Sequence, residues 1–227
     1  MTEANAPIAI DDAAVLWSTP VAERGERPLL VLLHGYNSDE TDLFGLAPYL
    51  PLEPTIASLR APLDAGYGYA WFPLAFGEDG RAIEDAGAPD GTGRGGAATA
   101  AVLDWVDRLD PVPTSIGLLG FSQGGAIALE LLRARPEAFA YAGVLAGFAD
   151  EGERAGDERL RELRPPVFWG RGTRDEVIPA SAVARTQAWL PEHATLVEGI
   201  YEGLGHQLSE AELADLVEFL RRRFRAA

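Results

Sequence analysis

Residues Gly120 to Gly124 read GFSQG and fit the pattern G-x-S-x-G. This pattern is typical of a nucleophile elbow, a sharp strand-to-helix turn that raises a serine hydroxyl above the carboxyl edge of a parallel sheet. Small residues on both sides of the serine let such a turn close. Ser122 is therefore the candidate nucleophile, provided that the chain also supplies the strand, the helix, a base and an acid.

The candidate base comes from three histidines, because a serine hydroxyl is a weak nucleophile without a partner that takes its proton. His34 ends an apolar run directly before Gly35, where we expect it to brace a loop. His193 follows Pro191 in polar surroundings, which predicts a solvated loop. His206 follows a glycine-rich turn at a predicted sheet edge, and it is the residue that we favour as the base.

The candidate acid is one of two aspartates that lie between Ser122 and His206. Hydrolases built from alternating strands and helices present their serine first, then the acid, then the histidine. Asp175 follows the apolar run PVFWG in the turn RGTRDEV, where a glycine lets the chain bend, and it is preferred. Asp150 follows the preceding strand and remains the alternative. The acid would hold the histidine tautomer and stabilise the imidazolium.

Attack on an acyl carbonyl creates an oxyanion that needs preorganised donors. By position, one donor is the backbone N–H of Gln123, directly after the nucleophile. The loop after the first buried strand should supply the second, and Tyr36 is the candidate. The aromatic pair Trp71 and Phe72 is a candidate wall of the acyl pocket, with ordinary core packing as the alternative.

The elements that must position these residues alternate along the chain. Apolar runs predict strands, and apolar residues at helical spacing predict helices. Strands are expected at 13–18, 28–34, 55–59, 115–121, 140–146, 166–170 and 194–201, and helices at 42–50, 97–109, 124–135, 179–190 and from 209, with a partly helical connection at 151–164. Ser209 and Glu212 have the spacing of a capping box. The alternation predicts an α/β fold with a mainly parallel sheet and helices on both faces.

The chain has 227 residues and is expected to form a single domain over residues 1–227, with 1–12 as a loose arm. Residues 64–94 show no clear period, which favours a long excursion that forms a pocket wall or lid. Within it, GTGRGG at 91–96 follows no strand and lacks the Lys-Ser/Thr pair of a phosphate loop, so a flexible loop is the preferred interpretation.

Composition excludes several classes of partner. The net charge is −16, from 19 basic and 35 acidic residues, which repels nucleic acid and anionic membranes. The chain has no cysteine, hence neither a disulfide nor a thiolate nucleophile. We expect no metal and no cofactor, because no cluster has ligand spacing and serine chemistry needs neither. No apolar run approaches the ~20 residues of a membrane span, and the first residues lack a signal-peptide pattern. A cytoplasmic location is the expectation.

With these residues assembled, the chain resembles the phospholipase/carboxylesterase family of α/β-hydrolases, which includes bacterial carboxylesterases and acyl-protein thioesterases. The matching segments are LLHG at 32–35, RAP at 60–62, WF at 71–72, GFSQGG at 120–125, RGTRDEVIP at 171–179 and YEGLGHQLSEAEL at 201–213. The resemblance implies Ser122, Asp175 and His206 as a catalytic triad, backbone donors near Tyr36 and Gln123, and no large cap domain.

The resemblance also implies a small-molecule substrate, namely a short- or medium-chain acyl ester, a lysophospholipid or an acyl thioester. The chain departs from the family pattern at YNSDE, residues 36–40, where many members carry a Leu-Gly pair, and at the segment 76–94. Two alternatives stay open: a serine peptidase or other acyl hydrolase of the same fold, and a non-catalytic ligand-binding relative. The sequence leaves open whether the protein forms a homodimer.

Overall fold

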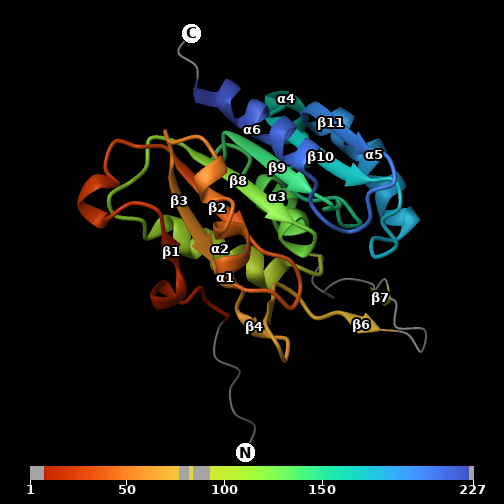
Figure 1. Ribbon diagram of the computed structural model, residues 1–227, viewed down its shortest axis with the longest axis horizontal. Coiled ribbons are helices and arrows are strands. Elements are labelled where there is room, and N and C mark those ends of the chain that lie inside the picture. Colours follow the sequence, from red (N-terminus) through yellow and green to blue (C-terminus); the bar gives the residue numbers. More distant parts are fainter. Residues whose placement is uncertain (1–7, 77–81, 84–92, 225–227) are drawn as a thin grey trace, which may run out of the picture.

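The computed structural model describes residues 8–76, 82–83 and 93–224 (Figure 1). Seven of its strands form one sheet in the order β1-β3-β2-β8-β9-β10-β11. They are β1 (Leu16–Trp17), β2 (Leu29–Leu33), β3 (Thr55–Leu59), β8 (Ile116–Phe121), β9 (Tyr141–Leu145), β10 (Pro166–Gly172) and β11 (Thr195–Tyr201). β1 runs antiparallel to β3, and every other neighbouring pair is parallel. The predicted mainly parallel sheet is confirmed.

Helices cover both faces of this sheet. They are α1 (Glu40–Phe44), α2 (Gly96–Asp107), α3 (Gln123–Ala134), α4 (Asp157–Leu163), α5 (Ala180–His193) and α6 (Glu210–Phe224), with short 3-10 helices η1 (Asp12–Ala14), η2 (Val21–Glu23) and η3 (Ala47–Tyr49). The core residues of α2, α3, α4 and α5 belong to one hydrophobic cluster, and those of α1 and α6 belong to a second. Within the part of the chain that the structure describes, no segment forms a large cap domain.

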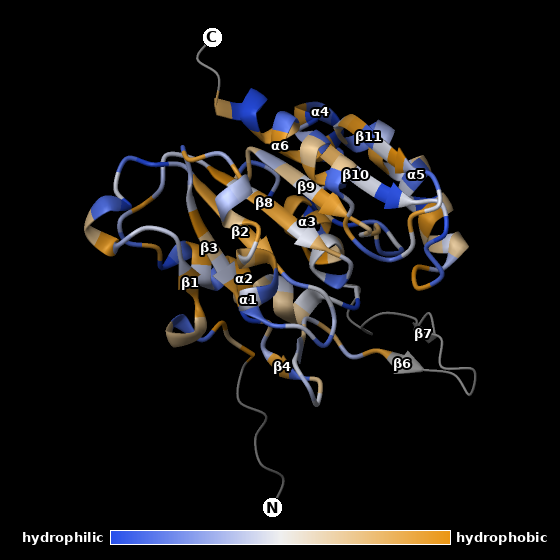
Figure 2. Ribbon diagram, in the orientation of Figure 1, coloured by the Kyte–Doolittle hydropathy of each residue, from blue (hydrophilic) through white to orange (hydrophobic). Residues whose placement is uncertain are grey.

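The central strand β2 shows how the sequence produces two hydrophobic layers. Its five residues LLVLL are all buried. Because side chains alternate between the faces of a sheet, Leu29, Val31 and Leu33 enter the cluster under α2 and α3. Leu30 and Leu32 enter the cluster under α1 and α6. Figure 2 shows the same pattern as hydrophobic colouring along β2, β8 and β9 at the centre of the molecule.

Three local predictions were wrong. The helix predicted at 42–50 is divided into α1 and η3, because Gly45 caps α1 and Pro48 lies within the tighter turn that follows. The arm predicted at 1–12 is not loose throughout: Ile10 is buried in the core, so the described chain is anchored from there on. Residues 1–7 lie outside the described residues.

The third concerns His193, which does not lie in a solvated loop. Helix α5 continues through Pro191 and ends at His193, which is only 2% exposed. The imidazole of His193 stacks on the indole of Trp189 at 4.1 Å between centroids, and Nδ1 of His193 lies 2.7 Å from the backbone carbonyl oxygen of Trp189. The aromatic packing thus outweighs the preference of proline for ending a helix.

The predicted excursion at 64–94 begins as a hairpin. β4 (Leu63–Asp64) pairs antiparallel with β5 (Tyr69–Ala70), and β6 (Ala75–Phe76) pairs with β7 (Ala82–Ile83). The parts 77–81 and 84–92 of the segment predicted as a pocket wall or lid, including the start of GTGRGG, lie outside the described residues. No helix among the described residues is long and apolar enough to span a membrane.

Candidate active site

Ser122 stands in the turn between β8 and α3, and close packing explains the glycines around it. A Cβ on Gly120 would lie 2.2 Å from the carbonyl oxygen of Gly124, and one on Gly124 would lie 1.9 Å from that of Leu33. Neither position has room for a side chain. Ser122 itself has φ 54° and ψ −116°, a conformation that residues other than glycine rarely adopt. Such backbone strain, typically about 1–3 kcal/mol, is concentrated at functional sites.

The three residues Ser122, His206 and Asp175 form a continuous chain of hydrogen bonds. Nε2 of His206 lies 2.9 Å from Oγ of Ser122, and Nδ1 of His206 lies 2.7 Å from Oδ2 of Asp175. The carboxylate can only accept, so Nδ1 carries a proton and leaves Nε2 free to accept from the serine hydroxyl. The sequence separates these residues by as much as 84 positions, and the sheet brings them together.

The loops that carry Asp175 and His206 are fastened to each other. The N–H of Thr173 donates to Tyr201, and the N–H of Arg174 donates to Leu204, at 3.0 and 2.9 Å. The N–H of Gly203 donates to Oγ1 of Thr173 at 2.9 Å. The spacing between acid and histidine is therefore held by backbone contacts as well as by their own hydrogen bond.

The second oxygen of Asp175 is also satisfied. Oδ1 accepts from the backbone N–H groups of Val177 and Ile178 at 2.9 and 3.1 Å. Burial alone would raise the pKa of this carboxyl, but the hydrogen bonds from His206 and from the two N–H groups outweigh burial and hold the pKa below its ordinary value. Asp175 is thus an anion at neutral pH that faces the imidazole.

Two backbone segments frame the face of Ser122 on which an oxyanion would form. Gln123 is the first residue of α3, so its N–H has no acceptor within the helix and lies at the positive end of the helix dipole. On the other side, a Cβ on Gly35 would lie 3.7 Å from Cβ of Ser122, which places the loop that continues into Tyr36 directly against the serine. Both predicted donors belong to segments next to the nucleophile.

The side chain of Gln123 has a second role that sequence reasoning missed. Its Oε1 accepts from the N–H of Trp71 at 2.8 Å, and its Nε2 donates to the carbonyl of Phe72 at 2.6 Å. Nε1 of Trp71 in turn donates to the carbonyl of His34 at 2.8 Å. Trp71 and Phe72 are 1% and 3% exposed, so they pack mainly in the core and connect the elbow to the end of β2.

Asn37 is a further residue that the sequence did not single out. Its backbone has φ 60°, and its Oδ1 accepts from the N–H groups of Tyr67 and Gly68 at 3.2 and 3.0 Å. Its N–H donates to the carbonyl of Tyr69 at 2.8 Å. The β4–β5 hairpin is thereby fixed on the loop that contains Tyr36. The only signal in the sequence was that Asn tolerates a left-handed backbone.

The alternative acid and base lie in structural contacts. Asp150 accepts from the N–H of Arg94 at 2.9 Å and from its Nε at 3.2 Å. Burial would raise the pKa of Asp150, and the contacts with Arg94 reverse that effect and lower it. His34 is fully buried, and its Nε2 accepts from the N–H of Ala61 at 3.0 Å. Burial lowers the pKa of His34, in keeping with a neutral brace.

No three His, Cys, Asp or Glu side chains gather into a possible metal site among the residues that the structure describes. The groups at this edge of the sheet are a serine hydroxyl, an imidazole and a carboxylate in sequence, with a helix N-terminus beside them. Such an arrangement transfers acyl groups.

Comparison with known proteins agrees with this geometry. The phospholipase/carboxylesterase family matches residues 19–223. The chain belongs to this family. Family members are hydrolases, and membership supports ester hydrolysis as the reaction class. The α/β-hydrolase fold and the family resemblance expected from the motifs are confirmed.

Individual family members cover nearly the whole chain at low identity. Carboxylesterase SOBER1 of Arabidopsis thaliana is 21% identical over 215 residues, which are 94% of this chain and 91% of that protein. Acyl-protein thioesterase 1 of Kluyveromyces lactis is 26% identical over 214 residues, which are 85% of this chain and 90% of that protein. The crystal structure of the Bacillus cereus carboxylesterase has a TM-score of 0.72 at 20% identity, covers 92% and 94% of the two chains, and shows the shared fold.

Proposed function

We propose that this protein is a serine esterase that hydrolyses small carboxylic esters through an acyl-enzyme on Ser122. The observation that carries the proposal is the hydrogen-bond chain from Ser122 through His206 to Asp175, at 2.9 and 2.7 Å. Membership of a carboxylesterase family supports the reaction class. The protein would act as one domain over its length, with a small acyl ester as its partner.

In the first half-reaction Oγ of Ser122 attacks the acyl carbonyl while Nε2 of His206 takes the serine proton. The carbonyl oxygen becomes an oxyanion, which the N–H groups of Tyr36 and Gln123 stabilise. Collapse of this intermediate breaks the bond to the leaving alcohol, which receives the proton from His206. The serine now carries the acyl group.

In the second half-reaction His206 takes a proton from water, and the resulting hydroxide attacks the acyl-serine. The second tetrahedral intermediate collapses, the proton returns to Oγ of Ser122, and the carboxylic acid leaves. Asp175 keeps the proton on Nδ1 and stabilises the imidazolium in both halves without accepting the proton.

The test is replacement of the nucleophile. Ser122→Ala should lower turnover of a p-nitrophenyl ester by about 10⁴-fold or more, while the unfolding temperature stays close to that of the parent. A fluorophosphonate probe should form an adduct on the parent protein at Ser122 and none on the variant. Retained turnover in the variant would exclude the acyl-enzyme, and an inert parent protein would favour the non-catalytic ligand-binding relative.

Acyl thioesters are the second candidate substrate class, because a full-length family member is named an acyl-protein thioesterase. The same oxyanion donors serve oxygen esters and thioesters. A panel of matched oxygen esters and thioesters with different acyl-chain lengths, together with a peptide amide, tests this choice. The substrate class with the highest kcat/KM identifies the protein as an esterase, a thioesterase or a peptidase.

A further inference from the structure

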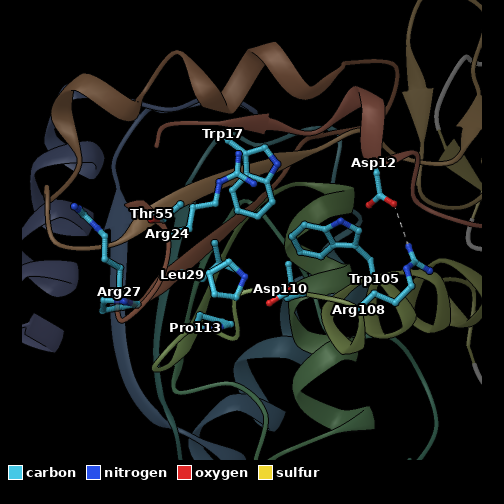
Figure 3. Close-up of a pocket in the computed structure, with 13 residues that line it drawn as sticks. Asp12, Trp17, Arg24, Arg27, Leu29, Thr55, Trp105, Arg108, Asp110 and Pro113 are labelled. Atoms are coloured by element: carbon cyan, nitrogen blue, oxygen red, sulfur yellow. Dashed lines mark ion pairs between the residues drawn. The ribbon is translucent and has the colours of Figure 1, made fainter. Parts of the chain in front are cut away.

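A second concave site (Figure 3) lies at the amino ends of the parallel strands, whereas Ser122 lies at their carboxyl ends. Its walls include Leu29 and Thr55, the first residues of β2 and β3, whereas Ser122 follows the carboxyl end of β8. Because these strands are parallel, the two sites are separated by the length of the sheet. The cavity has a volume of about 440 Å³, within the range of about 300–1,000 Å³ that small-molecule sites occupy.

Two indoles form one wall of this cavity. The rings of Trp17 and Trp105 lie 5.8 Å apart between centroids, at 35° to each other. The guanidinium of Arg24 lies over Trp17, 3.7 Å from the ring centroid. Figure 3 shows Arg24 beside Trp17, with Trp105 to the right of them. The cavity therefore combines an apolar surface with a cation that is already held in place.

Two of the three arginines that line the cavity, Arg24 and Arg27, lack carboxylate partners. Nε of Arg24 donates to the carbonyl of Thr19 at 2.9 Å, and Nη2 of Arg27 donates to that of Leu52. Both side chains are half-buried, and neither forms an ion pair with a carboxylate among the described residues. Burial lowers the pKa of Arg24, and no carboxylate offsets that effect.

Arg24 and Arg27 lack a carboxylate partner although the chain has 35 acidic residues and only 19 basic ones. Some other arginines each hold one carboxylate with two nitrogens, as Arg60 does with Glu40 and Arg133 does with Asp157. In contrast, no carboxylate among the described residues forms an ion pair with Arg24 or Arg27 in the cavity wall.

Two buried polar atoms of the same wall are also without a partner. Thr55 is 2% exposed, and its Oγ1 has no hydrogen bond to a described residue. Nε of Arg27 is also buried and has no hydrogen bond to a described residue. Buried polar groups are normally satisfied, and exceptions call for a water or a ligand. The residues that carry these atoms, and the two guanidiniums that lack a carboxylate, line one cavity.

The charge of the lining limits the ligand. Arg24, Arg27 and Arg108 face two carboxylates, of which Asp12 lies 3.7 Å from Arg108 and Asp110 is exposed. The excess is a single positive charge, which suits one monoanion and disfavours a polyanion. Guanidinium groups match the planar fork of a carboxylate. We propose that this cavity is a second ligand site, which binds a monocarboxylate carried on an apolar body.

The site is tested with fluorophenylacetate as the probe and fluorophenylacetamide as its neutral counterpart, observed by fluorine NMR. Ser122 is first capped with a fluorophosphonate, so that the candidate active site is blocked. The acid should bind the capped protein at least about tenfold more tightly than the amide, the difference that one charge-assisted hydrogen bond provides. Equal binding of acid and amide, tighter binding of inorganic phosphate, or loss of binding on capping would overturn the proposal.

Matched variants assign the binding to this cavity. Arg24→Gln should weaken binding of the acid about tenfold. The nearly isosteric Thr55→Val should weaken it without loss of stability, because the hydroxyl that it removes has no hydrogen-bond partner among the described residues. The control is Arg159→Gln, an exposed arginine on α4 that pairs with Glu137 and Glu162. Unchanged binding in both cavity variants would sink the proposal, and Thr55→Val keeps the test valid if Arg24→Gln does not fold.

Discussion

At the scale of single residues, two aspartates that look alike in the sequence have opposite surroundings. Asp175 faces His206 and two backbone N–H groups. Asp150 faces the guanidiniums of Arg94 and Arg154, at 3.2 and 3.4 Å. The first arrangement orients an imidazole, and the second ties the chain before α2 to the segment after β9. Removal of the charge should therefore lower activity at Asp175 and lower stability at Asp150.

The prediction is a comparison of Asp175→Asn with Asp150→Asn. The first should lower kcat by about 10³- to 10⁴-fold, because an amide at this position favours the wrong tautomer of His206. The second should lower the free energy of unfolding by about 3 kcal/mol, because it leaves buried arginines short of a partner. Ester turnover and urea unfolding measure the two effects. The same loss of activity in both variants would contradict the assignment of the acid.

Gln123 carries a second prediction at this scale. Gln123→Ala keeps the backbone N–H that would face the oxyanion but leaves the N–H of Trp71 and the carbonyl of Phe72 without their buried partner. Such a loss costs about 1–3 kcal/mol per group. The variant should therefore unfold at lower urea concentration and retain acylation by a fluorophosphonate. Parent-like stability together with a loss of acylation would show that the side chain acts in catalysis.

At the scale of elements, the β4–β5 hairpin packs on the loop at residues 36–40, which departs from the expected family pattern. This loop reads YNSDE, and its Asn37 has a left-handed backbone and accepts two hydrogen bonds from the hairpin. A Cβ on Gly68 would lie 2.5 Å from the carbonyl oxygen of Asn37. The hairpin and the loop beside Ser122 are thus packed without space for one more atom.

Gly68→Ala should push the hairpin away from Asn37, shift the loop that holds the N–H of Tyr36, and lower kcat by about 10²-fold, close to the loss of one oxyanion donor. The matched control is Tyr67→Ala, which removes a side chain that is 99% exposed at the neighbouring position. Steady-state ester kinetics and the KM of each variant separate loss of turnover from loss of binding. Equal kcat in the two variants would contradict a role for the hairpin.

The elements that local pattern decides were the ones that could be predicted. The run LLVLL is a buried strand in any parallel sheet, and Gly120 and Gly124 are dictated by contacts that every elbow of this kind makes. The bridge from Gln123 to Trp71 crosses 52 positions, so no local pattern contains it. The burial of His193 was missed for a different reason, because Pro191 indicated the end of a helix whereas α5 continues to His193, whose ring stacks on Trp189.

At the scale of the whole molecule, one buried carboxyl links stability to pH. Glu212 is 2% exposed, and its Oε1 occupies the space above Gly170 of β10. The predicted capping box is present, because the N–H of Glu212 donates to Oγ of Ser209 at 3.1 Å. Burial, with Asp215 nearby, outweighs the hydrogen bond from the backbone of Ser209 and raises the pKa of Glu212 to about 7.

A carboxyl with a raised pKa favours the folded state only while it is protonated. The folded protein holds this proton up to about pH 7, and the unfolded chain releases it near its ordinary value of 4.5. The contribution of Glu212 is therefore complete below about pH 4.5 and is lost as the pH rises to about 7. Glu212→Gln carries no titrating proton at this position, so the variant should gain stability relative to the parent across this window.

The gain should reach on the order of 3 kcal/mol above pH 7, since the pKa rises from 4.5 to about 7 and each unit of pKa corresponds to about 1.4 kcal/mol. Urea unfolding of both proteins from pH 4.5 to pH 8 measures it. The control is Glu210→Gln in the same first turn of α6, an exposed residue whose replacement should leave the pH dependence unchanged. A difference between Glu212→Gln and the parent that stays constant with pH would mean that the carboxyl of Glu212 is already ionised in the folded protein, and that the space above Gly170 holds a solvated charge.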